Sequence, residues 1–585
     1  MVLQKSIAII GAGSMAKRRS RCLKFMGYDN IICIETNPER REKYTEEFGY
    51  PCFSSFDDAL QKHSIEFMII SVPPHIHHIY MDLAIKYKTK FFVEASVLNT
   101  GYDKFIKNTF KYDIMNFPSC TLYFHPAIKQ IDKVIKLNIL GKLSHITYHS
   151  GQNLNDWHPY EDIRNFYVSN RDVGGCREIV PFELSWITKV FGFPTKVYAE
   201  VKKTVELKPD VDIDDVYSLT MDYSSHVFNM IVDVVSRPPI RELLVNGDKG
   251  QLRWNWNDKF ITVYEGTNKT QIDFTMMDAA EGYNKNITEE MYIDELKHFF
   301  NINNKEDTIN TLHYDNAVLN LLYRAETSSK VEKSLKYYNI GILLNVRLCS
   351  KRLNCKHLKI VDNIPIISWL ICRLQHIIKS YNLDIKIVLA SGNKEDNKKL
   401  VSLAKDNNIE VYFGNDNNIP KRHLECADYY GFTHLIPLDG DDIFVSELAI
   451  DNLISVITNS DRNITKTTGL PFGTNAIFYK TNYLRDVLRE YTNEIVETGW
   501  HRIFNNIPEI YIPCINNELI RLTLDYNDDF IFFEKLIQIL GEQFLTIKTK
   551  DLINIIINNE LYYYNSHLSK EYWDNFNKEK AKENQ

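Results

Sequence analysis

Near its start the chain reads Ser6-Ile7-Ala8-Ile9-Ile10-Gly11-Ala12-Gly13-Ser14-Met15-Ala16, and this segment indicates the fold of the N-terminal part. The apolar run predicts a strand, the two glycines predict a tight turn, and the residues that follow have helical spacing. A strand that leads through Gly-x-Gly-x-x-Ala into a helix is the setting in which this motif binds a dinucleotide. Gly11 permits the turn, and Gly13 lets backbone N–H groups approach a pyrophosphate at the positive end of the helix.

Strands and helices alternate through residue 120, which predicts a Rossmann domain with a parallel sheet over residues 1–120. Glu35 ends the second strand, where its carboxylate can accept hydrogen bonds from a ribose diol. This favours NAD(H), whereas Arg40 and Arg41 can hold a 2′-phosphate, so NADP(H) stays open. Strands are expected at Ile7–Ile10, Ile31–Glu35, Phe67–Val72 and Phe91–Glu94, with helices such as Met15–Met26 and Ile76–Tyr87 between them.

After about Ser119 the pattern becomes rich in strands without intervening helices, as in Lys196–Val205, Val216–Tyr223 and His226–Val235. This predicts an α+β substrate domain over residues 121–330, built on an open antiparallel sheet. Two helices, near Thr288–Phe300 and Leu312–Arg324, are expected to close it, and the polar segment Glu326–Ser334 is expected to be the domain junction.

The strand and helix alternation restarts beyond this junction and predicts a second α/β domain over residues 338–585. Its charged end, Lys578–Gln585, is expected to fray. The expected elements are strands at Ile340–Leu344, Ile385–Ala390, Glu410–Phe413 and His434–Pro437, and a helix near Ile366–Ser380.

Composition places the chain among soluble globular proteins, with 585 residues, 44% hydrophobic and 25% charged residues. Its net charge of -7 argues against nucleic-acid or membrane-surface partners, so cations are expected only locally, at phosphate sites. No apolar run is long enough for a membrane span, and the first strand leaves no room for a signal peptide. The ten cysteines lack a C-x-x-C pair, which predicts free thiols, no zinc site and a cytoplasmic location.

Four segments make residues 4–330 resemble the Gfo/Idh/MocA oxidoreductases: Ser71–His77, Phe92–Ser96, Asp156–Asp162 and the pair Gly174-Gly175, in addition to the glycine motif. The resemblance implies hydride transfer between a nicotinamide and a carbinol or ketone carbon of a sugar or polyol. It implies cofactor contacts from Gly11, Gly13, Ala16, Glu35, Arg40, Pro73, His77 and Glu94, and substrate contacts from Trp157, His158, Tyr160 and Arg164.

Two departures from that family concern the proton donor that ketone reduction needs. The family's Glu-Lys-Pro lysine is Ala95 here, and its histidine after the glycine pair has no clear counterpart, although Glu178 and Glu183 follow that pair. His158 and Glu178 are the candidate catalytic donors. The alternatives are that His158 only orients substrate, that Glu178 pairs with Arg177 or Arg164, or that this half is a scaffold without catalysis.

A second set of phosphate-binding residues lies in Arg347–Leu358, which places three cations and a hydroxyl directly after an apolar strand. Arg347, Arg352 and Lys356 can meet the phosphates of a nucleoside triphosphate, while Ser350 donates a hydrogen bond. The segment resembles the signature of the SpsF, CMP-KDO and CMP-sialate cytidylyltransferases, and the resemblance covers about residues 338–570. Its proline and glycine are replaced by Asn354 and Cys355.

Two acidic segments complete this resemblance, Leu438–Asp442 and Arg521–Asp529. It places Asp441 and Asp525 on the family's metal-binding aspartates, and Mg²⁺ prefers such carboxylates together with phosphate oxygens. Arg352 and Lys356 would be catalytic, and CTP as the nucleotide follows from the resemblance alone. The segment Gly469–Asn475 is expected to border the acceptor sugar, with Trp500 and His501 either beside it or purely structural.

Two nucleotide sites in one chain predict a bifunctional enzyme that acts on small-molecule nucleotides and sugar phosphates, with NAD(P)H and Mg²⁺ as cofactors. The two families imply a CDP-linked sugar alcohol for a bacterial surface polysaccharide, with fructose 6-phosphate as the specific hypothesis. The rival interpretation is a transferase that makes a CMP-linked acidic sugar, with a reductase upstream or a non-catalytic Rossmann scaffold. A homodimer is possible for both families.

Overall fold

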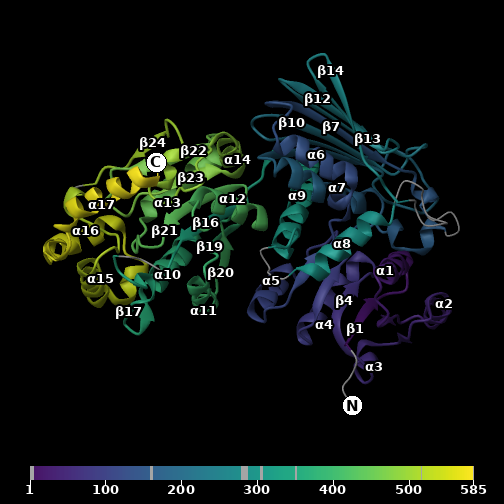
Figure 1. Ribbon diagram of the computed structural model, residues 1–585, viewed down its shortest axis with the longest axis horizontal. Coiled ribbons are helices and arrows are strands. Elements are labelled where there is room, and N and C mark those ends of the chain that lie inside the picture. The colour runs from purple at the N-terminus through teal and green to yellow at the C-terminus, as the bar shows by residue number, and fades with distance from the viewer. Residues whose placement is uncertain are drawn as a thin grey trace. The chain divides into compact units, whose positions relative to one another are not determined.

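The computed structural model describes residues 5–157, 162–277, 288–302, 307–348, 352–514 and 517–583 (Figure 1). The chain divides into two compact units, Met1–Tyr337 and Tyr338–Gln585. The nine described cysteines are free thiols. Within the described residues, none of the helices combines the length and apolar character that a membrane crossing requires.

Unit 1 begins with the predicted Rossmann-type parallel sheet, which the structure confirms. Its six strands lie in the order β3-β2-β1-β4-β5-β6, so the chain reverses direction across the sheet between β1 and β4. A ligand crevice forms at the carboxyl ends of strands where the order reverses in this way. The elements are β1 (Lys5–Ile10), α1 (Ser14–Phe25), β2 (Ile31–Ile34), α2 (Pro38–Phe48), β3 (Cys52–Phe53), α3 (Phe56–Leu60), β4 (Ser64–Ile70), α4 (His77–Lys86), β5 (Lys90–Val93), α5 (Tyr102–Lys111) and β6 (Asn116–Pro118).

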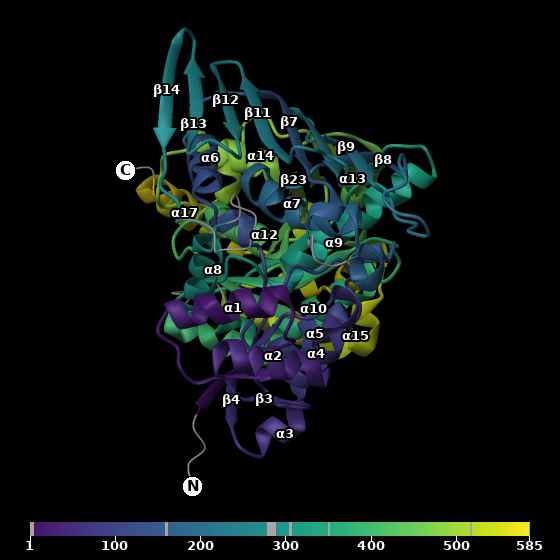
Figure 2. The same cartoon turned by 90° about the vertical axis from the view of Figure 1, so that its right-hand side faces the viewer.

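The second layer of unit 1 is a nine-stranded sheet in the order β14-β13-β12-β11-β7-β10-β9-β8-β15. Figure 2 shows its strands side by side from β14 to β8. Buried and exposed residues alternate along β10, because its inner face packs on helix α7 while the other face is open. The strands are β7 (Leu143–Gly151), β8 (Lys196–Lys202), β9 (Val216–Asp222), β10 (Val227–Asp233), β11 (Ile240–Gly247), β12 (Gly250–Asn255), β13 (Phe260–Glu265), β14 (Asn268–Asp273) and β15 (Leu335–Lys336). The helices are α6 (Pro126–Lys136), α7 (Cys176–Phe191), α8 (Glu290–Asn301) and α9 (Leu312–Lys330).

The expectation of a purely antiparallel sheet is wrong at one place, because β7 and β10 run parallel. A parallel pair needs a long crossover connection. The chain between these strands supplies one, since it forms α7, β8 and β9 before β10 returns beside β7. The central strand β7 therefore has a parallel neighbour on one side and the antiparallel β11 on the other.

The segment expected to be the domain junction is helical up to Lys330 and packs within unit 1. The hydroxyl of Ser328 accepts a hydrogen bond from the Ala199 N–H at 2.9 Å, and that of Ser329 accepts one from the Val201 N–H at 3.2 Å. These N–H groups lie on the outer edge of β8, where β15 pairs only with Lys196 and Val197. The polar side chains of this segment thus bind the N–H groups of a sheet edge, and the segment is not a linker.

Unit 2 is an α/β structure around a seven-stranded sheet in the order β20-β19-β16-β21-β23-β22-β24. Its core strands β20, β19, β16 and β21 are parallel, while β23 is antiparallel to both of its neighbours. The strands are β16 (Ile340–Asn345), β17 (Ile360–Val361), β18 (Ile364–Pro365), β19 (Ile385–Gly392), β20 (Glu410–Gly414), β21 (His434–Asp439), β22 (Ile464–Thr468), β23 (Ile477–Lys480) and β24 (Glu509–Tyr511). The helices are α10 (Ile366–Ile378), α11 (Leu400–Asp406), α12 (Ile419–Tyr430), α13 (Glu447–Asn459), α14 (Thr481–Glu490), α15 (Asn527–Leu540), α16 (Thr549–Asn558) and α17 (Leu568–Glu583).

The expectation of a frayed end from Lys578 is wrong for the described residues, because α17 runs to Glu583. The Glu583 carboxylate accepts hydrogen bonds from the Thr498 N–H at 2.9 Å and from Arg502 at 2.7 Å. A charge-assisted contact of this kind fixes a helix end that composition alone would leave in solvent.

We expect Ser328→Ala to lower the free energy of unfolding of unit 1 by about 1–3 kcal/mol, because it leaves the buried Ala199 N–H without an acceptor. Thr327→Ala is the matched control on the same turn, since Thr327 is exposed and its hydroxyl donates to the Tyr323 carbonyl of the same helix. Urea denaturation of the full chain, together with hydrogen exchange at Ala199, measures the effect. Equal losses for both variants would contradict the role given to Ser328.

Candidate functional site

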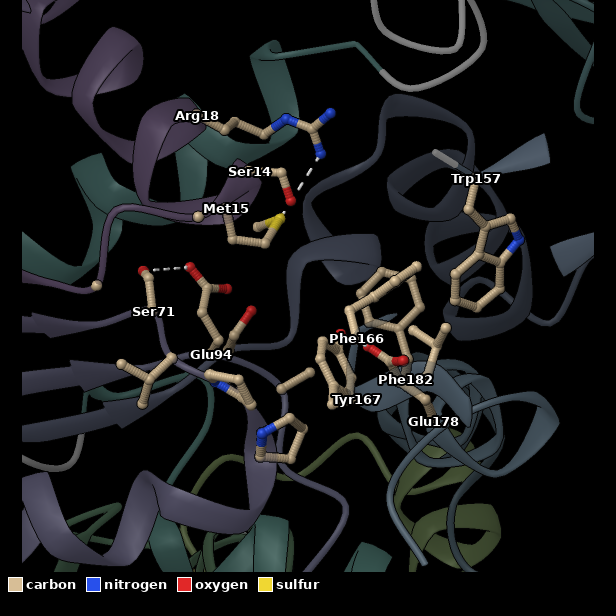
Figure 3. A pocket seen from close by; sticks show the side chains of 18 of the residues that line it. Ser14, Met15, Arg18, Ser71, Glu94, Trp157, Phe166, Tyr167, Glu178 and Phe182 are labelled. Atoms are coloured by element: carbon tan, nitrogen blue, oxygen red, sulfur yellow. Dashed lines mark hydrogen bonds between the residues drawn. The ribbon is translucent and has the colours of Figure 1, made fainter. Parts of the chain in front are cut away.

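A cavity of about 1830 Å³ opens in unit 1 at the carboxyl ends of β1 and β4. Figure 3 shows Ser14, Arg18, Ser71 and Glu94 at one end and a group of aromatic residues at the other. Among the predicted cofactor and substrate residues, Ala16 does not line it, because its side chain is fully buried on the inner face of α1. The predicted residues that line it are Gly11, Gly13, Glu35, Arg40, Pro73, His77, Glu94, Trp157, Arg164 and Glu178.

The glycine turn between β1 and α1 has the geometry that the motif predicts. Gly11 has a φ of +99°, and a Cβ there would lie 2.7 Å from the Ser71 carbonyl oxygen. A Cβ on Gly13 would meet nothing within 4 Å, so this backbone is open to the cavity. Glu35 supports the turn by accepting the Ala12 N–H at 3.0 Å, and it also lines the cavity. The hydrogen bond from Ala12 thus fixes Glu35, the candidate for binding the ribose, relative to the glycine turn.

The two arginines considered for a 2′-phosphate differ in their surroundings. Arg41 donates to the backbone oxygens of Glu35 and Thr36 at 2.8 and 2.7 Å, which holds its guanidinium against the loop. Arg40 is exposed and lines the cavity. Arg40 is thus the arginine that a phosphate on the ribose can reach.

Glu94 and His77 are cofactor candidates whose polar atoms also hold the cavity wall. Arg19, in the buried face of α1, binds both oxygens of Glu94 at 2.7 and 2.8 Å and also binds Glu295 at 2.9 Å. His77 is hydrogen-bonded to the Val72 carbonyl at 2.8 Å, and burial lowers its pKa to about 4. The imidazole is therefore neutral at physiological pH and fastens the turn after β4.

Glu178, in the first turn of α7, has the environment of a proton donor. Its Oε1 accepts a hydrogen bond from the Tyr167 hydroxyl at 2.5 Å, while its buried Oε2 has no hydrogen-bond partner among the described residues. Burial raises the pKa of Glu178 to about 7. The alternative of an ion pair is wrong, because Arg177 binds Glu326 at 2.6 Å and Arg164 binds Asp162 at 2.8 Å.

Glu183, the other carboxyl after the glycine pair, is fully occupied. It accepts hydrogen bonds from Tyr148 at 2.6 Å, Ser150 at 2.9 Å, Trp186 at 2.8 Å and Arg241 at 2.6 Å. Both oxygens of Glu183 are engaged by these four donors, so this side chain has a structural role.

The surroundings of Glu178 include residues that sequence reasoning missed. Phe166, Tyr167 and Phe182 lie with Trp157 at this end of the cavity (Figure 3). None of the three belongs to a motif, and only their closeness in sequence to the glycine pair could have suggested them. The predicted donor His158 and the predicted substrate residue Tyr160 lie outside the described residues.

In unit 2 the structure brings together four residues from three separate segments of the sequence. Lys356 Nζ lies 2.5 Å from Asp441 Oδ2 and 3.1 Å from Asp525 Oδ1, and Arg352 lies 2.9 Å from the same Asp525 oxygen. Arg347 points to a different partner, Glu497, at 2.6 Å, and Ser350 lies outside the described residues. The Lys356 ammonium therefore joins the two acidic segments directly beside the cationic loop.

The carboxyl groups around Lys356 differ in charge. Burial and the neighbouring Asp441 raise the pKa of Asp439, and the same two effects raise that of Asp442. Burial also opposes the charge of Asp441, but Lys356 outweighs it and lowers the Asp441 pKa. In the described ranges, no three histidine, cysteine or acidic side chains converge as a complete metal site. A cation here would need ligands from a substrate as well.

Three further contacts surround this cluster. Trp500 donates to Asp439 at 3.3 Å, so it lies at the site, whereas His501 is exposed. Asn345 also donates to Asp439, at 3.2 Å, where β16 and β21 end together. A Cβ on Gly473 would lie 3.0 Å from Asp442 Oδ1, which places the Gly469–Asn475 segment against the carboxylates.

The comparisons with known proteins bear on unit 1. Residues 5–96 match the family model GFO_IDH_MocA, described as an oxidoreductase family with an NAD-binding Rossmann fold. No curated protein sequence matches the chain. The chain is similar in fold to an oxidoreductase from Agrobacterium radiobacter in complex with NAD⁺, L-tartaric acid and magnesium, at 13% identity and a TM-score of 0.50, over 57% of this chain and 98% of that one.

Two other solved structures are similar over the same share of this chain. One is levoglucosan dehydrogenase in complex with NADH, with 15% identity, 99% of that chain covered and a TM-score of 0.49. The other is a putative myo-inositol dehydrogenase from Sinorhizobium meliloti 1021, with 15% identity, 99% coverage and a TM-score of 0.47. The family match is what supports an NAD-binding oxidoreductase domain of the Gfo/Idh/MocA kind in the N-terminal part of the chain.

We expect Gly11→Ala and Gly13→Ala to separate folding from dinucleotide binding. Gly11→Ala should lower both the Tm and NADH affinity, because its Cβ meets the Ser71 carbonyl at a positive φ. Gly13→Ala should leave the Tm unchanged and weaken NADH binding roughly 10-fold or more, because its Cβ enters the space of the pyrophosphate. NADH fluorescence titration and thermal unfolding measure the two effects, and unchanged NADH affinity in Gly13→Ala would refute this placement of the pyrophosphate.

Proposed function

We propose that the chain is a bifunctional enzyme with one reaction in each unit. Unit 1 reduces a sugar carbonyl with NAD(P)H, and unit 2 transfers a cytidylyl group from CTP to a sugar phosphate with Mg²⁺. Together they would give a CDP-linked sugar alcohol for a bacterial surface polysaccharide, with fructose 6-phosphate as the acceptor hypothesis. The observation that carries the proposal is the pair of sites in one chain, the cavity beside the glycine turn and the Lys356 cluster.

The reductase proposal is supported by the position of Glu178 in the same cavity as the glycine turn. When bound, the nicotinamide supplies the hydride for the carbonyl carbon. The carbonyl oxygen then needs a proton. Because Tyr167 donates to Oε1, the proton of Glu178 resides on Oε2, which no other described residue binds. This carboxyl can take the part of the family's lysine, which is Ala95 here.

The cofactor residues favour NAD(H). Glu35 lines the cavity with a carboxylate that can accept from a ribose diol, and a 2′-phosphate would meet its negative charge. Arg40, which also lines the cavity, keeps NADPH as a candidate. Unit 1 has room beyond a dinucleotide for a sugar at the aromatic end, where apolar rings can cover a sugar face.

The transferase proposal is supported by the cations and carboxylates around Lys356. Attack of a sugar phosphate on CTP brings two anions together, and Mg²⁺ offsets their repulsion. Asp441 and Asp525 would hold the ion together with phosphate oxygens. Lys356 and Arg352 already lie at these carboxylates and would neutralise the phosphates of the departing pyrophosphate. The choice of cytidine rests on the resemblance of the Arg347–Leu358 segment.

The central test is to incubate the full chain with CTP, Mg²⁺, NADH or NADPH and a panel of ketose phosphates. We expect pyrophosphate release, loss of reduced cofactor and a product mass that contains two phosphates. A product with one phosphate would instead identify a CMP-linked sugar. Asp441→Asn should abolish pyrophosphate release and spare reduction of a supplied CDP-ketose. It is a cleaner test than Asp525→Asn because the Asp441 side chain is 24% exposed and that of Asp525 only 2%, so its loss disturbs the fold less. Pyrophosphate release without cofactor loss for every ketose would remove the reductase half.

The rate of carbonyl reduction should fall as the pH rises through about 7, because Glu178 donates only in its protonated form, which predominates below its pKa of about 7. The reverse oxidation needs the carboxylate and should rise over the same range. Glu178→Gln should lower reduction roughly 10²- to 10⁴-fold and remove this inflection. Tyr167→Phe should move the inflection to higher pH, since the hydrogen bond from Tyr167 lowers the pKa of Glu178. A profile unchanged in both variants would exclude Glu178 as the donor.

A further inference from the structure

The C-terminal helix α17, yellow in Figure 1, is attached at both ends although most of its surface is exposed. Leu568 is the only one of its residues, all of them described, that is fully buried. Near its start, the ring of Tyr572 lies 5.1 Å from that of Phe472. At its end, Glu583 binds the Thr498 N–H and Arg502. A helix with a single buried residue adds little to the hydrophobic core of unit 2. Its contacts with the candidate nucleotide site therefore need a separate explanation.

That inner face presents Tyr572 to the two arginines that bind Asp525. The Arg521 guanidinium carbon lies 4.7 Å from the centre of the Tyr572 ring, and that of Arg352 lies 5.4 Å from it. Both arginines bind Asp525, Arg521 at 3.0 Å and Arg352 at 2.9 Å. A ring face near a guanidinium attracts it and limits its rotation. Each guanidinium therefore contacts the Asp525 carboxylate and also lies near the ring of Tyr572.

The phenol of Tyr572 does not act as an acid or base at physiological pH. Burial raises its pKa first, and the aspartates of the cluster, Asp525 foremost, raise it further. The hydroxyl stays protonated, so Tyr572 acts on the site through the contacts of its ring with the two arginines. The Arg352 side chain is 35% exposed, and its guanidinium carbon also lies 5.6 Å from the centre of the Tyr526 ring. Tyr572 is therefore one of two rings that limit how far Arg352 can turn into solvent.

We propose that Tyr572 is a positioning residue of the candidate nucleotide site. Its ring holds Arg352 and Arg521 at Asp525, so that the remaining N–H groups of Arg352 face the phosphates of a nucleoside triphosphate. The C-terminal helix is thereby part of the site rather than an appendage. This inference rests on the nucleotide site proposed for unit 2, and its test contains one measurement that does not depend on nucleotidyl transfer.

The experiment compares Tyr572→Ala, Tyr572→Leu and Tyr572→Phe in the full chain, with Tyr563→Ala as the matched control. Tyr563 is 64% exposed, and its ring lies near that of Tyr562. The first readout is the rate at which phenylglyoxal, a reagent for arginine, labels Arg352, measured by peptide mass spectrometry. The second is KM for CTP against kcat for pyrophosphate release. Thermal unfolding shows which variants are folded.

Loss of the ring should speed labelling of Arg352 roughly 5- to 10-fold and raise KM for CTP by a similar factor, with kcat within about 2-fold of the wild type. Tyr572→Phe keeps the ring and should behave like the wild type, as should Tyr563→Ala. Tyr572→Leu also removes the ring but fills more space than alanine, so it provides the test if Tyr572→Ala does not fold.

Unchanged labelling and KM in the folded ring-deleted variants would overturn the proposal, and so would a Tyr572→Phe variant as impaired as Tyr572→Ala. A wild-type chain that transfers no nucleotide would instead remove the proposed function of unit 2. In that case the labelling rates still decide whether Tyr572 holds Arg352.

Discussion

In each unit a buried cation joins two carboxylates from distant parts of the sequence. Arg19 of α1 binds Glu94 after β5 and Glu295 of α8, which ties the Rossmann sheet to the helix that closes unit 1. Lys356 does the same for Asp441 and Asp525 in unit 2. A charge removed from water costs several kcal/mol unless it is paired, so neither cation can leave its place without its partners. The walls of both candidate sites are fixed by these pairs.

The parts of the fold that the sequence predicts well depend on local patterns. The strand before Gly11 is apolar from Ile7 to Ile10, as expected for a parallel sheet covered on both faces, and the turn needs glycine because of the Ser71 carbonyl. The same logic applies to β16, β19 and β21 in unit 2, whose apolar runs are buried. The positions of Asp441 and Asp525 follow a motif order, and the structure brings them within reach of one ammonium.

The features that the sequence could not supply depend on pairings between distant residues. The parallel contact of β7 with β10 is one, because either strand has the alternation of an antiparallel strand. The hydroxyls of Ser328 and Ser329 are another, since a polar run at a helix end is typical of a linker until a sheet edge lies beside it. Tyr167 belongs to no motif, yet its hydroxyl decides which oxygen of Glu178 is left for a proton.

Three carboxyl groups, Glu94, Glu178 and Glu183, show how surroundings assign roles to the same side chain. Arg19 binds Glu94 and Arg241 binds Glu183, so both carboxyl groups serve as anchors. Glu178 accepts a hydrogen bond from a phenol and forms no ion pair within the described residues, and burial raises its pKa to about 7. A lysine at position 95, which lines the same cavity, would add a positive charge and favour the ionised form of Glu178. Ala95 therefore leaves Glu178, the proposed donor, without a neighbouring positive charge that would favour its ionised form.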